Sequence, residues 1–106
     1  MSQFTDEKFD HFLNTQQLCG FHTDWSLYEV DDLNTKHPFP QGCEVVYLKG
    51  EHWGDHDQIV PVEGDTWVDL WRAADQAILG SGDSHHCFIE EFTLTNGNQL
   101  VLRTGS

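Results

Sequence analysis

The spacing of hydrophobic residues near the N-terminus predicts an amphipathic helix over residues 6–18. Residues that recur every three or four positions lie on one helix face, and here they are Phe9, Phe12, Leu13 and the polar Gln16. Thr5 has the side-chain oxygen of an N-cap residue. Gly20 stands where a left-handed residue commonly ends a helix. The apolar stripe of this helix is short.

A wider apolar stripe predicts a second helix over residues 66–79. Asp65 or Thr66 is expected to cap its start, and Gly80 and Gly82 mark its end. The residues at helical spacing on its apolar face are Trp67, Leu70, Trp71, Ala74, Ala77 and Ile78. This stripe is wide enough to lie across a β-sheet, so we interpret its two tryptophans as core residues.

Three further segments have the composition of β-strands. Residues 25–30 alternate irregularly between polar and apolar positions, whereas residues 43–48 are almost continuously apolar and are expected to form a central strand. Residues 58–62 are expected to form a short edge strand, because Pro61 cannot donate a backbone hydrogen bond. The Asp, Pro and Gly residues of segment 31–42 predict an exposed loop.

The last part of the chain, residues 86–102, predicts a β-hairpin. Polar and apolar residues alternate before Asn96-Gly97, which is a strong turn signal. A three-residue loop would pair Leu94 with Leu100, Phe92 with Leu102 and Glu91 with Arg103, whereas a two-residue loop would place Arg103 opposite Glu90. We prefer the three-residue loop because it keeps the large apolar side chains on one face.

These elements predict a single α+β domain that spans residues 1–106. Their order is α-β-β-β-α-β-β, which suits a small, largely antiparallel sheet of four or five strands with both helices packed on one face. The large aromatic side chains, among them four Trp and seven Phe, are sufficient to fill a compact core.

Acidic residues dominate the charge of the chain. Five Lys and Arg residues face eighteen Asp and Glu residues, for a net charge of −13. Nucleic-acid and anionic-lipid surfaces are bound by clustered cations, so we expect no direct binding to nucleic acid or to a membrane. The acidic surface has two interpretations: it only solvates the protein, or it docks a basic partner or imitates nucleic acid.

The lengths of the apolar runs and the spacing of the cysteines predict the cellular compartment of the protein. No apolar run reaches the roughly 18 residues of a membrane span, and residues 1–10 lack the apolar core of a signal peptide. Cys19, Cys43 and Cys87 are odd in number, widely spaced and without a CxxC motif, which favours free thiols in a reducing compartment. We therefore expect a soluble, cytoplasmic protein.

Two groups of residues have side chains that bind metals. His52, His56 and Asp57 belong to a predicted loop over residues 50–57, and His85-His86-Cys87 leads into the hairpin. If the two segments met, the candidate ligands would be His52, His56, Asp57, His86 and Cys87. Adjacent strand residues point to opposite faces, however. Polar surface or hydrogen-bonded histidines are the favoured interpretation, and a metal site is the alternative.

The candidate ligand-binding residues are Trp53, His52, His56, His86 and Glu90. Trp53 lies in a polar loop, and an exposed Trp in such a loop is able to cap a small-molecule pocket or anchor a protein interface. Glu90 alternates with Phe88 and Phe92, so it either shares their face in the core or faces solvent.

The sequence contains no catalytic or cofactor-binding motif. Neither a dinucleotide-binding Gly-rich loop, a P-loop nor an EF-hand loop is present, so we expect no cofactor and assign no catalytic residue. The favoured hypothesis is a non-enzymatic protein-interaction or small-ligand-binding module, whose partner is a basic protein or a second copy in a homodimer. One alternative is a small metal-assisted enzyme that uses the two histidine groups. Another is an acidic inhibitor that imitates nucleic acid, of the kind encoded by phages, integron cassettes or other mobile elements.

Overall fold

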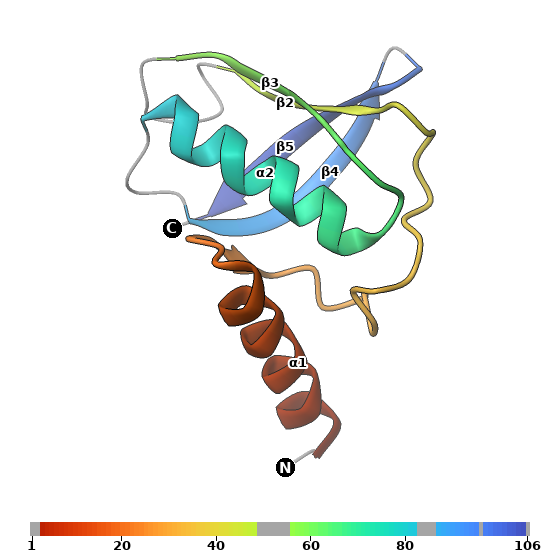
Figure 1. Cartoon of the computed structure of the whole chain (residues 1–106), viewed down its shortest axis with the longest axis vertical. Coiled ribbons are helices and arrows are strands. Elements are labelled where there is room, and N and C mark those ends of the chain that lie inside the picture. Colours follow the sequence, from red (N-terminus) through yellow and green to blue (C-terminus); the bar gives the residue numbers. More distant parts are fainter. Residues whose placement is uncertain (1–2, 49–55, 83–86, 96, 106) are drawn as a thin grey trace.

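The computed structural model describes residues 3–48, 56–82, 87–95 and 97–105, which form two helices and five strands. In chain order these are α1 (Gln3–Cys19), β1 (Asp24–Trp25), β2 (Glu44–Tyr47), β3 (Gln58–Pro61), α2 (Trp67–Ser81), β4 (Phe88–Thr95) and β5 (Gln99–Gly105). Figure 1 shows a curled sheet with α2 lying across it and α1 projecting away. The predicted α+β class is confirmed.

The sheet is mixed, so the prediction of a largely antiparallel sheet is wrong. Its strands lie in the order β1-β4-β5-β2-β3. β4 with β5 and β2 with β3 are antiparallel, whereas β1 with β4 and β2 with β5 are parallel. Parallel neighbours need a long connection between them, and local sequence patterns do not report such pairings. The prediction that β2 is internal and β3 is an edge strand is confirmed.

The C-terminal hairpin has the predicted register. Leu94 pairs with Leu100, Phe92 with Leu102 and Glu91 with Arg103. The register shifts between Ile89 and Glu91, which makes Glu90 the extra residue of a β-bulge. Because of this bulge, Ile89 and Phe92 are both buried and Glu90 is exposed. The option that Glu90 shares a core face with Phe88 and Phe92 is therefore wrong.

The second helix is confirmed, with Thr66 as its cap and Gly82 at its end, but Gly80 lies inside the helix, which continues to Ser81. Thr66 and Asp69 form a capping box, and Gly82 ends the helix in a left-handed conformation. Burial opposes ionisation of Asp69, but hydrogen bonds from Thr66 and Arg72 outweigh it and lower the pKa of that carboxyl. The predicted face packs on the sheet and buries Leu70, Trp71, Ala74, Ala77 and Ile78.

The first helix does not lie on the same face as α2, so that prediction is wrong. It begins at Gln3, upstream of the predicted cap Thr5, and ends at Gly20 as expected, with a φ of 72°. Of its apolar stripe only Phe12 is buried. Lys8 contacts the Tyr28 carbonyl and pairs with Asp31 at 2.9 Å, which fixes one side of α1 to the loop after β1. Figure 1 shows α1 extending away from the sheet at the edge that β1 forms.

Segment 25–42 differs from the prediction in two ways. The first strand has two residues rather than six, because the chain turns at Tyr28 and Glu29. The predicted exposed loop over 31–42 is partly buried: Leu33 is completely inaccessible and its carbonyl accepts the amide of Val68 at 3.0 Å. The carbonyl of Thr35 likewise accepts the amide of Trp67, at 3.0 Å. This loop supplies acceptors for unpaired amides at the start of α2, which its polar composition does not reveal.

A buried carboxylate joins α2 to the turn between α1 and β1. The side chain of Asp75 is 8% exposed. Its Oδ1 accepts hydrogen bonds from the amides of His22 and Thr23 and from the Thr23 hydroxyl, at 2.7–3.0 Å. That hydroxyl accepts the indole N–H of Trp71 at 3.0 Å. Nothing in the sequence pattern singled out Asp75.

We predict that Asp75→Ala destabilises the fold by about 2–4 kcal/mol, because it leaves buried donors without an acceptor. The neighbouring Gln76 is exposed on the same helix, so Gln76→Ala is the matched control and should change stability by less than about 0.5 kcal/mol. Urea unfolding followed by tryptophan fluorescence measures both. Equal stabilities for the two variants would show that the Asp75 bonds are dispensable.

Candidate functional site

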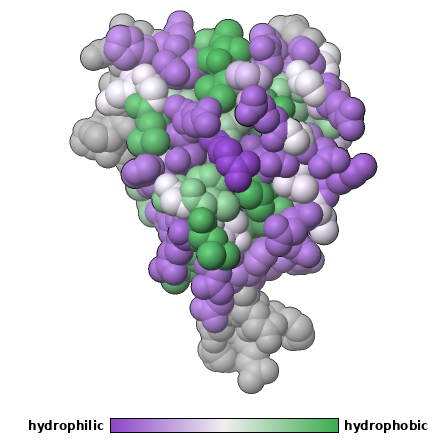
Figure 2. All heavy atoms as spheres, in the orientation of Figure 1, coloured by the Kyte–Doolittle hydropathy of each residue, from purple (hydrophilic) through white to green (hydrophobic). Residues whose placement is uncertain are grey.

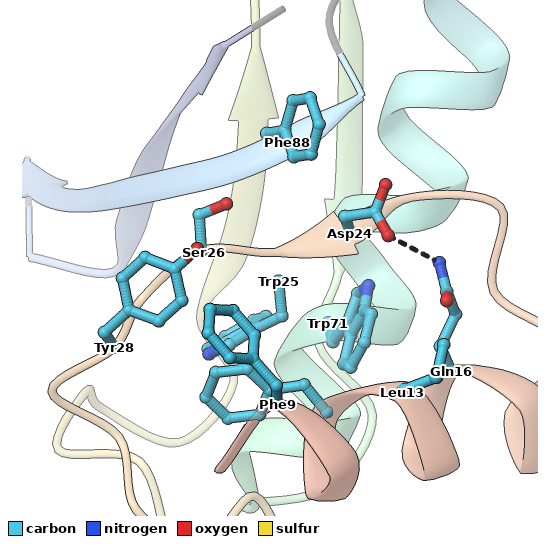
Figure 3. Close-up of a pocket in the computed structure, with 10 residues that line it drawn as sticks. Phe9, Leu13, Gln16, Asp24, Trp25, Ser26, Tyr28, Trp71 and Phe88 are labelled. Atoms are coloured by element: carbon cyan, nitrogen blue, oxygen red, sulfur yellow. Dashed lines mark hydrogen bonds between the residues drawn. The ribbon is translucent and has the colours of Figure 1, made fainter. Parts of the chain in front are cut away.

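A hollow of about 290 Å³ opens between α1, the edge strand β1 and the start of β4. Figure 3 shows Phe9 and Leu13 of α1 on one side of it, Phe88 on the other and Trp25 and Trp71 between them. The ten residues that line it are Phe9, Phe12, Leu13, Gln16, Asp24, Trp25, Ser26, Tyr28, Trp71 and Phe88. Aromatic side chains therefore make up six of the ten.

The floor of the hollow is part of the aromatic core. Trp25 and Trp71 are buried, and their ring centroids lie 5.4 Å apart. Phe12 is also buried and stacks on Tyr28, with 6.2 Å between centroids. Because α2 and the core hold these rings, the floor is preformed.

The walls of the hollow are large apolar side chains that remain open to solvent. They are Phe9, Leu13, Tyr28 and Phe88, each between 38% and 50% exposed. Figure 2 shows a largely hydrophilic face on which a hydrophobic area lies where α1 joins the rest of the molecule. Single exposed apolar residues are ordinary, but a gathered group marks a binding surface. We define these four residues as the apolar walls.

Three polar side chains complete the hollow. Gln16 donates from Nε2 to the Thr23 carbonyl at 2.6 Å and to Asp24 Oδ1 at 3.1 Å. Asp24 and Ser26 flank the buried Trp25 in the sequence, and both are half-buried where they line the hollow. Among the described residues, no ion pair includes Asp24, and no Lys, Arg or His lines the hollow. Hydrogen-bond acceptors and aromatic faces thus dominate its chemistry.

Three of the described cations form ion pairs away from the hollow. Lys8 lies 2.9 Å from Asp31, Lys36 lies 3.6 Å from Asp65, and Arg72 lies 3.0 Å from Asp69. Arg103 stands opposite Glu91 in the hairpin. With eighteen Asp and Glu residues and five Lys and Arg residues, most carboxylates of the chain have no cation to pair with.

A second hollow lies near the start of α2 and is less suited to binding. Its volume is about 330 Å³, and it is lined by Gln41, Gly42, Val62, Gly64 and Asp65. It has no aromatic wall, and the carboxylate of Asp65 already pairs with Lys36. We therefore take the aromatic hollow as the candidate site.

Of the residues predicted for a site from the sequence, those that the structure describes do not line this hollow. His52, Trp53, His85 and His86 lie outside the described residues, so their convergence stays a prediction. His56 donates its amide to the Ser81 carbonyl at 3.2 Å, which places it at the end of α2. Asp57 is exposed, and Glu90 is an exposed bulge residue.

The cysteines are free thiols, as predicted: Cys19 is exposed, Cys43 is buried and Cys87 is half-buried. Burial raises the pKa of the Cys43 thiol. Within the described part of the chain, no three His, Cys, Asp or Glu residues are grouped so that they could hold a metal ion.

His37, which no sequence pattern singled out, is 7% exposed and packs beside Phe39 and Trp67. Its Nδ1 accepts the amide of Phe39 at 3.2 Å, and its buried Nε2 has no hydrogen-bond partner among the described residues. Burial lowers the pKa of His37, and the charges of Asp65 and Asp69 oppose that effect. The side chain is therefore neutral near pH 7. The polar sequence around it suggested an exposed position, so no pattern could have identified it.

Comparison with protein-family models, curated proteins and solved structures finds no match to this chain. The site is therefore interpreted from its own geometry. None of the described helices combines the length and hydrophobicity needed to cross a membrane.

We predict that protonation of His37 destabilises the fold in mild acid. Its pKa is lower in the folded state, so the unfolded chain binds the proton first. The stabilisation is complete above the ordinary value of about 6.5 and is lost as the pH falls through the lowered pKa, by at most about 1.4 kcal/mol per pH unit.

His37→Asn tests this prediction, because it keeps an acceptor near the Phe39 amide and removes the titrating group. Urea unfolding between neutral pH and mild acid should give a smaller loss of stability in the variant than in the wild type. Parallel pH profiles for the two proteins would contradict the assignment.

Proposed function

We propose that this chain is a non-enzymatic interaction module that binds a basic partner protein at the aromatic hollow. The observation that carries the proposal is the gathering of the apolar walls around one opening on a strongly acidic surface. Interfaces place aromatic and aliphatic anchors at their centre and polar groups at their rim. Asp24, Ser26 and Gln16 correspond to such a rim.

The size of the hollow supports a partner that inserts one side chain. Sites for drug-sized ligands commonly occupy about 300–1,000 Å³, and this hollow, with about 290 Å³, falls just below that range. The remaining contact would come from the exposed apolar walls, which burial beneath a partner would remove from water.

Charge favours a basic partner over a second copy of the chain. Each copy has a net charge of −13, so two copies repel one another, most strongly at low ionic strength. A basic partner is attracted by the same field. The hypotheses of a metal-assisted enzyme and of a nucleic-acid mimic have no such support from the described residues.

We predict that Leu13→Ser weakens partner binding by about tenfold or more, because it removes a large apolar side chain from the walls of the hollow. Short random peptides displayed on phage would be selected against the full chain, and the selected peptides would be synthesised and titrated by calorimetry. We expect basic residues beside Leu, Phe or Trp in the selected sequences.

Leu18→Ser is the matched control. Leu18 lies on the same helix, is 88% exposed and does not line the hollow. This variant makes the same substitution and should bind the peptides within about twofold of the wild type. The proposal fails if no peptide is enriched, or if both substitutions weaken binding equally.

A further inference from the structure

The aromatic rings of the hollow are suited to a cation. The faces of aromatic rings carry partial negative charge and attract cationic groups that approach within about 6 Å of the ring centre. Phe9, Tyr28 and Phe88 are partly exposed above the buried Trp25 and Trp71. Figure 3 shows Phe88 facing the hollow from the side opposite Phe9.

The carboxylate of Asp24 points to the same ligand. Its Oδ1 accepts only the neutral amide of Gln16 among the bonds described, and the residue is half-buried and lines the hollow together with the aromatic residues. An apolar ligand would cover this carboxylate and leave its charge without a counter-ion, which is costly. A cationic ligand would form a charge-assisted hydrogen bond instead. Binding therefore favours a group that is flat, apolar on its faces and positively charged.

Arginine fits these requirements better than lysine. The guanidinium group is planar, weakly hydrated and able to stack on a ring while its edge donates to a carboxylate, whereas an ammonium is compact and strongly hydrated. The protein contains one such contact already: the Arg72 guanidinium lies 5.8 Å from the centre of the Phe21 ring and also bonds Asp69.

We propose that the hollow receives an arginine side chain of the partner protein. Its guanidinium would lie against the aromatic members of the apolar walls and bond the Asp24 carboxylate. This inference rests on the proposed function and names the group that the module recognises. The Asp24 carboxylate and the Ser26 hydroxyl, which line the hollow, would accept hydrogen bonds from the guanidinium, and the apolar stem of the arginine would lie along Leu13.

The test compares arginine with citrulline, which has the same shape and no charge. The capped peptide Ac-Gly-Leu-Arg-Leu-Gly-NH2 and its citrulline and lysine counterparts would be titrated into the isotopically labelled full chain. The indole N–H signals of Trp25 and Trp71 report binding at the hollow. We expect the arginine peptide to bind at least about fivefold more tightly than the citrulline peptide and more tightly than the lysine peptide.

Two variants distinguish the effect of the Asp24 carboxylate on binding from the effect of the net charge of the protein. Asp24→Asn should reduce the arginine-to-citrulline ratio to below about twofold, because it removes the charge-assisted bond. Glu63→Gln changes the net charge equally at an exposed position that does not line the hollow, and it should keep the ratio. Phe88→Leu keeps an apolar wall without a ring and should lower the ratio.

Three outcomes would overturn the inference: similar affinities for arginine and citrulline, a ratio that survives Asp24→Asn, or no response of the hollow to any of the three peptides. The peptide selection with the Leu13 and Leu18 variants tests binding at the hollow and does not depend on whether the charge of an arginine is recognised there. If selected peptides bind at the hollow but citrulline replaces arginine without loss, the proposed function stands and the arginine assignment falls.

Discussion

The arrangement of this protein depends on the buried carboxylate of Asp75. Its Oδ1 accepts the two consecutive amides of His22 and Thr23, and Thr23 joins it to the Trp71 indole. Buried amides without acceptors are costly, so the turn after α1 has one favourable position against α2. That position fixes where α1 ends and where β1 begins, and β1 then adds to the sheet beside β4 in parallel.

The hollow follows from the way this turn is held. Because α1 leaves the sheet at its edge, Phe12 reaches the core while Phe9 and Leu13 stay half-exposed. A helix lying flat on the sheet would have buried its whole stripe and closed the space above Trp25. Phe9 and Leu13 therefore stay in water although α1 is held firmly in place. Gln16 of this helix donates a hydrogen bond to the Thr23 carbonyl, and His11 accepts one from the Leu33 amide. Such exposure lowers stability, and a bound partner would relieve it.

Local sequence signals predicted the parts of the fold that depend on neighbours in the chain. The stripe of α2, its Thr66 cap and the pairing of the C-terminal hairpin are of this kind. The parallel pairings, the buried Leu33 and the bulge at Glu90 depend on contacts between distant segments, which no periodicity records. The hollow was missed for the same reason: Phe9, Trp25 and Phe88 were each assigned to an element, but only the pairing of β1 with β4 brings them together.

Charge and shape act over different distances at this site. Separated surface charges are screened beyond about 8 Å at physiological ionic strength, so the net charge of −13 speeds the approach of basic partners without selecting among them. Selection requires short-range contacts in a place where water is partly excluded and electrostatic interactions are stronger. Asp24 is half-buried and lines the aromatic hollow, unlike the exposed Asp31, whose interaction with Lys8 is open to solvent. The acidic surface therefore governs the rate of encounter, whereas the fit of one side chain in the hollow governs how long a complex lasts.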